Sequence, residues 1–583
     1  MLVQVLVYFF FIFGLFAIIK NTFKINNNFS LIFLITSLIF FICLINSYLI
    51  FFEFINILKI FDYFLIIFIS TFGLYSFYLN KKKIFLSIKT FFKENNKILD
   101  IFILTFIISY FIFSLSPAVD IDSMRYHLAI PQKILENNFY KNPTLDYLYI
   151  GYGEIISLIG LIFKFDNAIS VLNTISLFLI YILNKDIYKK YKIGLENYST
   201  LIIFSIPYLL SNLSSQKIYL FPCFLIAYAS IYICLEKKIN FITVISIVIT
   251  NIFCLLSKNS FFLIFIINNI LIINLLKNNK KNLLIFLAIS IILLTLSFIP
   301  FIYFKNKIFF EPLSPFIILN NENNWLINYK DYLLNYGSTI FKENFLETLL
   351  GIIIPIEKYK IVQSIGLPFL LGIPAFFYLI KKKKFKLAIL LLLYFLTVLL
   401  VNIQARWFIP YVLITSVFFI SYKNNFNYVV KKIILLQCFG IFFIINIFNS
   451  LIIPTVISKE KKNEFLNSYV YGSNIKNYVN HNYKYHYIIS DIENDYYLQN
   501  NISLYGYNFW KNSKNNQFTL TIEKNKNYII ITDNINNFNE YLFYLNANDI
   551  YNIKKYNKYF STTNRIFFSK DEKIFYFIVF KKT

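Results

Sequence analysis

The residues best suited to chemistry lie together in one short segment, SPAVDIDSMRYHLAIP, residues 116–131. Two carboxylates, Asp120 and Asp122, are followed directly by Arg125, Tyr126 and His127. Carboxylates and imidazoles transfer protons, and a guanidinium binds anions with two parallel hydrogen bonds. The segment follows directly after a long apolar run, so we expect it at a membrane edge.

A purely structural interpretation of this segment is that Asp120 or Asp122 caps a helix that begins near Ser123. Capping would account for one aspartate and would leave the other polar residues unexplained. The chain has only three arginines and three histidines, and one of each lies in this segment. We therefore favour a functional role.

A second candidate group is VNIQARWFIPYVL, residues 401–413, where Gln404 and Arg406 lie between two apolar runs. Arginine is rare in a chain that uses lysine for nearly all its positive charge, so Arg406 is expected to do what lysine cannot. A bidentate contact with a phosphate is such a task. The alternative is an arginine whose head extends to the membrane surface, beside a Trp407 that anchors the interface.

Two weaker signals are predicted on the same side of the membrane. Lys258, in LLSKNSFF, is an isolated cation between two apolar runs, and Pro312 and Pro315 stiffen the segment FFEPLSPF. For each, a structural role is as well supported as a functional one. His481 and His486 lack a third ligand, so we predict no metal site from them.

The composition identifies the element type that must position these residues. Of 583 residues, 58% are hydrophobic and only 15% are charged, which is typical of a protein with many membrane spans. The net charge of +26 would suggest nucleic acid in a soluble protein. Here the lysines lie between apolar runs, so the charge indicates topology and we predict no nucleic-acid partner.

About fourteen apolar runs are long enough to span a membrane. They lie near 2–19, 29–52, 55–79, 98–115, 166–184, 198–213, 218–235, 239–256, 260–276, 282–304, 361–380, 386–402, 407–422 and 433–451. Lysine clusters occupy alternate loops, which the positive-inside rule places in the cytoplasm. The loops 116–165 and 305–360 and the C-terminal region then lie outside. Residues 148–165 would reverse this pattern if they spanned, so we interpret them as an interfacial or re-entrant helix.

Three regions follow: N-terminal transmembrane helices (1–97), a transmembrane region that holds the candidate residues (98–452), and a small extracytoplasmic α/β domain (457–583). In the last region, short β-rich runs at 486–491, 527–533, 565–569 and 573–580 alternate with helix-like stretches at 462–480 and 536–546. The SKDEK sequence between the last two runs predicts a hairpin turn.

The pattern D-x-x-R-Y-H after a span, followed by an amphipathic stretch and an interfacial helix, resembles the GT-C superfamily of integral-membrane glycosyltransferases. Bacterial aminoarabinose and protein O-mannosyl transferases are similar in style. The resemblance covers roughly 98–415 and continues at Lys258, at Pro312-x-x-Pro315-Phe316, and at Gln404-x-Arg406. The chain departs from the family at Ser123, where many relatives have Glu, and at Lys217, near where a relative's acidic residue is expected.

The resemblance implies transfer of a sugar from a polyprenyl-phosphate donor to an acceptor on the outer face of a bacterial inner membrane. It implies Asp122 as the general base, with Asp120 as alternative or helper, and Arg406 with Lys258 as the cations that bind the donor phosphate. Arg125, Tyr126, His127 and Gln404 would orient the loop or the acceptor. No cofactor is required, a divalent metal is left open, and the acceptor is a glycan, lipid or protein.

A transporter or flippase for a lipid-linked sugar or another amphiphile is the alternative from a different class. Transporters usually place charges at the membrane midplane, on broken helices within internal repeats. In this chain the charges cluster at one membrane edge and no repeat is evident. The sequence therefore favours the transferase.

Overall fold

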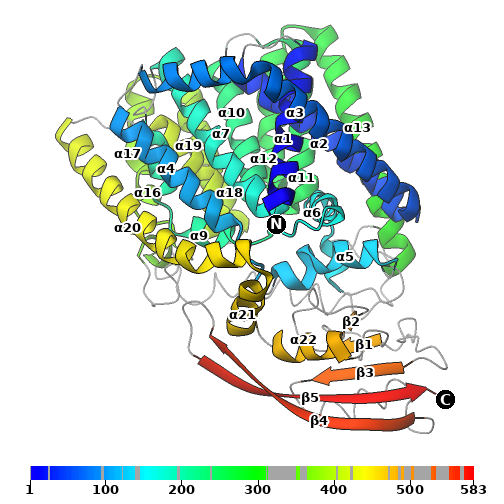
Figure 1. Ribbon diagram of the computed structural model, residues 1–583. Coiled ribbons are helices and arrows are strands. Elements are labelled where there is room, and N and C mark those ends of the chain that lie inside the picture. Colours follow the sequence, from blue (N-terminus) through cyan, green and yellow to red (C-terminus); the bar gives the residue numbers. More distant parts are fainter. Residues whose placement is uncertain are drawn as a thin grey trace.

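A computed structural model shows a large helical part with a β-sheet at one end (Figure 1). The described residues are 2–23, 27–93, 97–120, 122–137, 139, 145–192, 197–236, 239–309, 312, 350–354, 364–401, 405–419, 424–470, 473–482, 487–490, 501–503, 527–532, 551–564 and 570–582. Most of the predicted loop 305–360, the second proline of the FFEPLSPF segment and Gln404 lie outside them.

The first thirteen helices are α1 (Leu2–Phe23), α2 (Asn28–Phe51), α3 (Ile55–Lys93), α4 (Lys97–Ser114), α5 (Ala129–Leu135), α6 (Tyr152–Ile162), α7 (Ala168–Tyr191), α8 (Asn197–Phe204), α9 (Tyr208–Leu213), α10 (Leu220–Leu235), α11 (Phe241–Ser257), α12 (Phe262–Leu276) and α13 (Lys280–Phe309). They are followed by α16 (Leu367–Leu370), α17 (Gly372–Lys381), α18 (Phe385–Val401), α19 (Ile409–Phe418) and α20 (Asn424–Ile457). Four short helical turns are η1 (Ser123–His127), η2 (Leu145–Tyr149), η3 (Asn259–Phe261) and η5 (Ala405–Phe408). All fourteen predicted apolar runs overlap helices.

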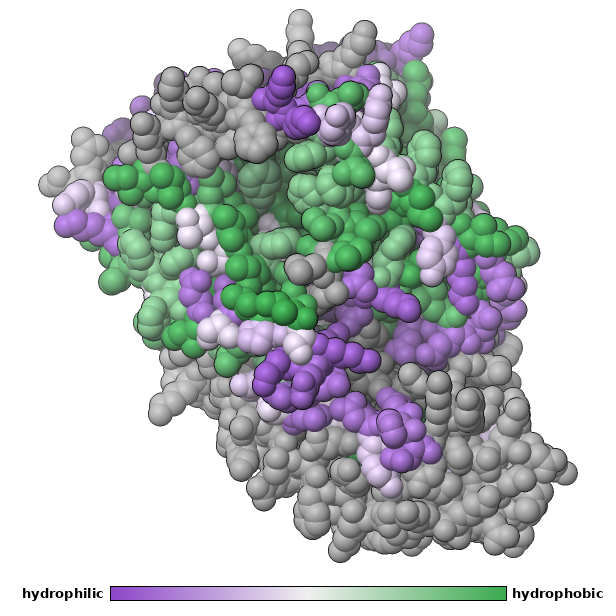
Figure 2. Space-filling view, viewed as in Figure 1, coloured by the Kyte–Doolittle hydropathy of each residue, from purple (hydrophilic) through white to green (hydrophobic). Residues whose placement is uncertain are grey.

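The protein is a helical integral membrane protein. Among the described residues, seven helices are long and apolar enough to cross a membrane: α1, α2, α3, α7, α12 with the turn before it, α13 and α20. Large apolar side chains on several of them point outward, and Phe64 and Leu436 are more than 70% exposed. Figure 2 shows this broad hydrophobic face, with hydrophilic residues gathered where the helices meet the C-terminal region.

Two of the predicted spans are not single continuous helices. Residues 198–213 form two short helices, α8 and α9, because Pro207 supplies no backbone N–H at the junction and disfavours a helical residue before it. The run 361–380 likewise divides into α16 and α17. Length alone therefore supports fewer spans than the fourteen apolar runs suggested.

The segment predicted as interfacial or re-entrant contains the 11-residue helix α6. At 1.5 Å per residue this helix is about 16 Å long, too short to cross about 30 Å of hydrocarbon. Nearly all of its residues are buried, and α6 packs against α2, α5 and α7. It is thus a short helix that is buried within the bundle.

The C-terminal region contains α21 (Lys459–Tyr469), α22 (Ser473–Asn482) and five strands. The strands are β1 (Tyr487–Ser490), β2 (Asn501–Ser503), β3 (Asn527–Thr532), β4 (Tyr551–Asn564) and β5 (Lys570–Lys582), in the order β2-β1-β3-β5-β4. β1 pairs in parallel with β2 and β3, whereas β5 is antiparallel to β3 and β4. The helices α21 and α22 and the sheet lie at the same end of the molecule as α5 (Figure 1).

The predicted C-terminal hairpin is placed differently along the chain. β4 and β5 do form an antiparallel pair, in which Asn564 lies opposite Lys570. Residues 565–569, which the sequence had suggested as a strand, lie outside the described residues. Lys570, Asp571 and Glu572, expected in the turn, belong to β5. β5 extends beyond the apolar run KIFYFIVF into these polar residues because their backbones pair with β4. Hydrophobicity alone does not predict this extension of the strand.

Candidate functional site

The aspartate segment forms a π-helical turn, η1, between α4 and α5. The backbone N–H of Leu128 donates to the carbonyl of Ser123, five residues back, at 2.9 Å. Such turns are rare and frequently occur at functional sites. Asp120 caps this turn, because its Oδ2 accepts hydrogen bonds from the backbone N–H and the hydroxyl of Ser123, at 3.0 and 2.7 Å.

The two aspartates differ, because only Asp120 caps the turn. Asp122 makes no capping bond, and its side chain is 40% exposed. Its Oδ2 lies 2.8 Å from Nζ of Lys217, which also lies 3.1 Å from Oδ1 of Asp120. The structural interpretation of the segment is therefore correct for Asp120, and it leaves Asp122 available at the surface.

Sequence reasoning missed Lys217 as a functional residue, because it treated this position only as one that lacks an acid. Burial alone would lower the pKa of Lys217, but the carboxylates of Asp120 and Asp122 raise it above its ordinary value. Burial alone would raise the pKa of Asp122, but Lys217, and to a lesser extent His127 and Arg125, lower it below its ordinary value. Both groups are thus charged at neutral pH.

The backbone around Lys217 is fixed to the aspartate turn and to α7. The N–H of Gln216 donates to the hydroxyl of Ser123 at 2.8 Å, and the Gln216 side chain donates to the hydroxyl of Ser170 at 3.1 Å. The side chain of Asn173 donates to the carbonyl of Lys217 at 2.9 Å. These bonds bring two segments nearly a hundred residues apart into one site.

His127 is held by Glu154, a residue at the start of α6. The Nδ1 of His127 lies 2.7 Å from Oε1 of Glu154, and the other oxygen of Glu154 accepts the N–H of Gly151 at 2.7 Å. Both side chains are buried. The Nε2 of His127 is buried and has no hydrogen-bond partner among the described residues. The ring of Tyr126 lies 4.1 Å from that of His127, centroid to centroid.

Two glycines allow the start of α6 to approach this site closely. A Cβ at Gly153 would lie 2.2 Å from a side-chain carbon of Ile218, and a Cβ at Gly151 would lie 2.3 Å from the carbonyl oxygen of Leu256. No larger residue fits either position without movement of its neighbours. The two glycines therefore bring α6 against the chain that carries Lys217 and the end of α11.

Arg406 lies in the turn η5, immediately before α19. Its guanidinium carbon lies 4.9 Å from the ring centre of Trp407, and its backbone oxygen accepts the hydroxyl of Tyr219. Among the described residues, the buried Nε of Arg406 and the buried indole N–H of Trp407 have no hydrogen-bond partners. Both groups could therefore still donate a hydrogen bond.

Lys258 lies between α11 and η3, beside the aromatic rings of Tyr219 and Trp407. Its Nζ lies 4.9 Å from the ring centre of Tyr219 and 5.7 Å from that of Trp407. Burial, and then the positive charges of Arg406 and Lys217, lower the pKa of Lys258 to about 7. The mutual repulsion shows that the three cations form one electrostatic group, and an anion would relieve it.

The structure thus gathers Asp120, Asp122, Arg125, Tyr126, His127, Lys258 and Arg406, and it adds Lys217 and Glu154. Gln404 lies outside the described residues, as does Pro315 of the proline pair. Glu154 could have been found from the sequence, because a charged residue in a helix that packs into a membrane protein needs a partner. No such signal points to Lys217.

The C-terminal region also contacts this site. Met124, inside the π-helical turn, and Leu128 form a buried apolar cluster with Leu466 of α21 and with Val470, which follows that helix. Lys462, also on α21, forms an ion pair with Asp166 at 3.1 Å. The position of α21 is therefore coupled to the turn that carries the aspartates.

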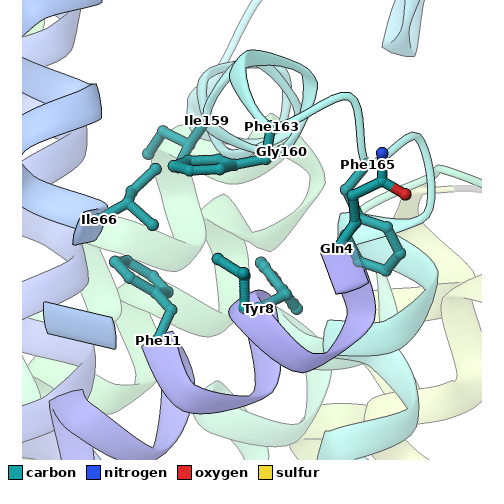
Figure 3. Close-up of a pocket in the computed structure, with 9 residues that line it drawn as sticks. Gln4, Tyr8, Phe11, Ile66, Ile159, Gly160, Phe163 and Phe165 are labelled. Atoms are coloured by element: carbon teal, nitrogen blue, oxygen red, sulfur yellow. The ribbon is translucent and has the colours of Figure 1, made fainter. Parts of the chain in front are cut away.

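A small cavity lies elsewhere, between α1, α3 and α6 (Figure 3). Its volume is about 10 Å³, and apolar side chains dominate its lining: Val7, Phe11, Ile66, Ile159, Phe163 and Phe165, with Gln4, Tyr8 and Gly160. It is too small and too apolar to bind a sugar phosphate. None of the candidate site residues lines it.

Among the described residues, no group of three or more His, Cys, Asp or Glu side chains could hold a metal ion. Comparisons with family models, with curated proteins and with solved structures found no match for this chain. The chemistry of the site must therefore be inferred from its own residues.

Proposed function

We propose that this protein is a membrane glycosyltransferase that moves a sugar from a polyprenyl-phosphate donor to an acceptor hydroxyl on the outer face of a bacterial inner membrane. The observation that carries the proposal is the combination of an exposed aspartate with three cations. Lys217, Lys258 and Arg406 outnumber the two aspartates, so the site has a positive excess suited to a phosphate.

In the proposed reaction, the acceptor oxygen attacks the anomeric carbon while the bond from that carbon to the phosphate oxygen breaks. The proton of the acceptor hydroxyl passes to Asp122, and the bonding electrons leave with the polyprenyl phosphate. Asp122 is ionised at neutral pH because of Lys217. Asp120 holds the turn in which Asp122 lies.

The departing phosphate would bind to Arg406 and Lys258. Preorganised cations stabilise charge that develops on a leaving group, and they act most strongly where water is largely excluded. The Nε of Arg406 has no hydrogen-bond partner among the described residues, and burial and the neighbouring positive charges lower the pKa of Lys258 to about 7, so an anion would stabilise both cations. Lys258 lies against the rings of Tyr219 and Trp407, and Arg406 lies against the ring of Trp407.

The outward orientation rests on the lysine pattern and has its own test. Cysteines introduced at Ser468, on α21, and at Lys189, near the end of α7, are at exposed positions. In intact cells, an impermeant maleimide should label the first and leave the second unlabelled until the membrane is permeabilised. The reverse result would place the site in the cytoplasm and contradict the donor assignment.

The function itself is tested with purified protein in lipid nanodiscs and a panel of polyprenyl-phosphate sugars, by release of the lipid phosphate. Asp122→Asn should reduce turnover about 100-fold or more, because it keeps the shape of the side chain and removes the proton acceptor. Asp186→Asn, at the far end of α7, is a control that should keep wild-type turnover. Full activity of both Asp122→Asn and Asp120→Asn would refute the proposal, and a donor that is moved across the bilayer without cleavage would favour the flippase.

A further inference from the structure

Lys217 occupies the place where two neighbouring carboxylates could otherwise bind a divalent ion. Its Nζ lies 3.1 Å from Oδ1 of Asp120 and 2.8 Å from Oδ2 of Asp122. A divalent ion bridging these two oxygens would need to lie roughly 2.0–2.6 Å from each of them. The ammonium group already fills that position.

Several of the other carboxylate oxygens near this turn are already committed to hydrogen bonds. Oδ2 of Asp120 accepts both hydrogen bonds from Ser123. Glu154, another acid beside this turn, holds His127 with one oxygen and the N–H of Gly151 with the other. The fixed positive charge of Lys217 beside both aspartates disfavours the binding of a second cation.

Lys217 is held in this position by its own backbone and not only by the aspartates. Asn173 binds its carbonyl, and the adjacent Gln216 binds Ser123 and Ser170. Its side chain is 27% exposed, and the paired carboxylates keep it protonated. The cation is therefore part of the architecture and needs no uptake from solution.

We propose that the ammonium of Lys217 takes the position of a divalent cation at the Asp120–Asp122 pair, so that this site binds no divalent metal and orients Asp122 without one. The part of this inference that concerns catalysis rests on the proposed transferase function. The part that concerns metal binding does not.

The binding test uses Mn²⁺ as the probe, with the full chain in nanodiscs of neutral lipid and electron paramagnetic resonance of the free ion as the readout. Wild type and Asp122→Asn should bind the same small amount of Mn²⁺. Lys217→Glu should gain a site, with affinity increased at least about tenfold, because a third carboxylate replaces the cation. Lys190→Glu, which adds the same charge next to Glu236 at another part of the surface, is the matched control for nonspecific attraction.

Two results would overturn the inference. One is Mn²⁺ binding by the wild type that Asp122→Asn abolishes, and the other is a folded Lys217→Glu protein with no gain over Lys190→Glu. If Lys217→Glu does not fold, the comparison of wild type with Asp122→Asn still decides.

Activity gives a second readout. Transfer by the wild type should change by less than about twofold after EDTA treatment and dialysis, and loss of transfer that Mn²⁺ or Mg²⁺ restores would contradict a metal-free site. If no donor is cleaved under any condition, the proposed function fails. The Mn²⁺ comparison still decides the inference about Lys217.

Discussion

Two lysine–carboxylate groups lie at opposite ends of the same pair of helices, and they differ in every property that matters for function. At one end, Asp100 of α4 accepts hydrogen bonds from Tyr181, Lys185 and Asn197 at 2.6, 3.0 and 2.8 Å. The other end is the cluster around Asp122, beyond the last residue of α4 and beside the start of α7. At 1.5 Å per residue, the length of α4 separates the two ends by about 25 Å.

The Asp100 group is closed. One lysine faces one aspartate, and their side chains are 6% and 1% exposed. The Asp122 group is open: three cations share two aspartates, and Lys217 and Asp122 are 27% and 40% exposed. The comparison teaches that a charge pair in an apolar protein indicates a site only where charge is unbalanced and surface remains accessible. A balanced, buried pair holds helices together.

The largest expected effect is a loss of protein stability when the Asp100 group is changed. Lys185→Met leaves Asp100 buried without its cation, which costs about 3–5 kcal/mol. Lys217→Met should cost at most about 1 kcal/mol, because its partners are partly exposed to solvent. Unfolding in mixed micelles with increasing SDS measures both. Equal losses of stability would show that the two groups do not differ as described.

Arg406→Lys tests whether the Asp122 group binds the donor phosphate. We expect donor kcat/KM to fall about tenfold, because lysine keeps the charge and loses the two-pronged contact with phosphate. Thermal stability should not change. Arg565→Lys, in the C-terminal region, is the matched control. Kinetics that match the wild type would return Arg406 to the role of a membrane-surface anchor and leave Lys258 as the main phosphate ligand.

Lys258 should make donor binding dependent on pH. With a pKa of about 7, the free protein carries the charge below pH 7 and loses it above, whereas a bound phosphate favours the protonated form. The KM for the donor should therefore rise about fivefold to tenfold between pH 7 and pH 9. Lys258→Arg stays charged and should give a flat profile over this range. A flat profile in the wild type would contradict the lowered pKa.

The smallest effect concerns α21. Leu466→Ala should loosen its contact with Met124 and reduce turnover about twofold to threefold, because the aspartate turn is then less well fixed. Leu436→Ala, on the lipid-facing side of α20 and 74% exposed, is the control. Measurement of kcat and of thermal stability separates loss of positioning from loss of folding. Turnover that is unchanged would uncouple the C-terminal region from the site.

Hydrophobic runs and lysine spacing were sufficient to predict a helical membrane protein and to place nearly every helix. They also predicted the polar segment with Asp122 and the separate β-containing region, because both signals depend on local composition. Helix breaks were less predictable. Pro207 lies between α8 and α9, whereas Pro300 and Pro454 lie inside continuous helices.

What the sequence by itself determined is therefore the apolar frame, and the identity of the residues that could act in it: the two aspartates, the rare arginine and histidine, and Lys258. Only the tertiary structure decided which aspartate caps and which is free, and that Lys217 joins them. The reason is physical: hydrophobicity acts along a run of neighbours, but a hydrogen bond or ion pair forms between atoms about 3 Å apart, whatever their distance in sequence. Asp120 and Lys217 are ninety-seven positions apart in the sequence, and the packing of the Lys217 segment against α7 brings the two side chains into contact.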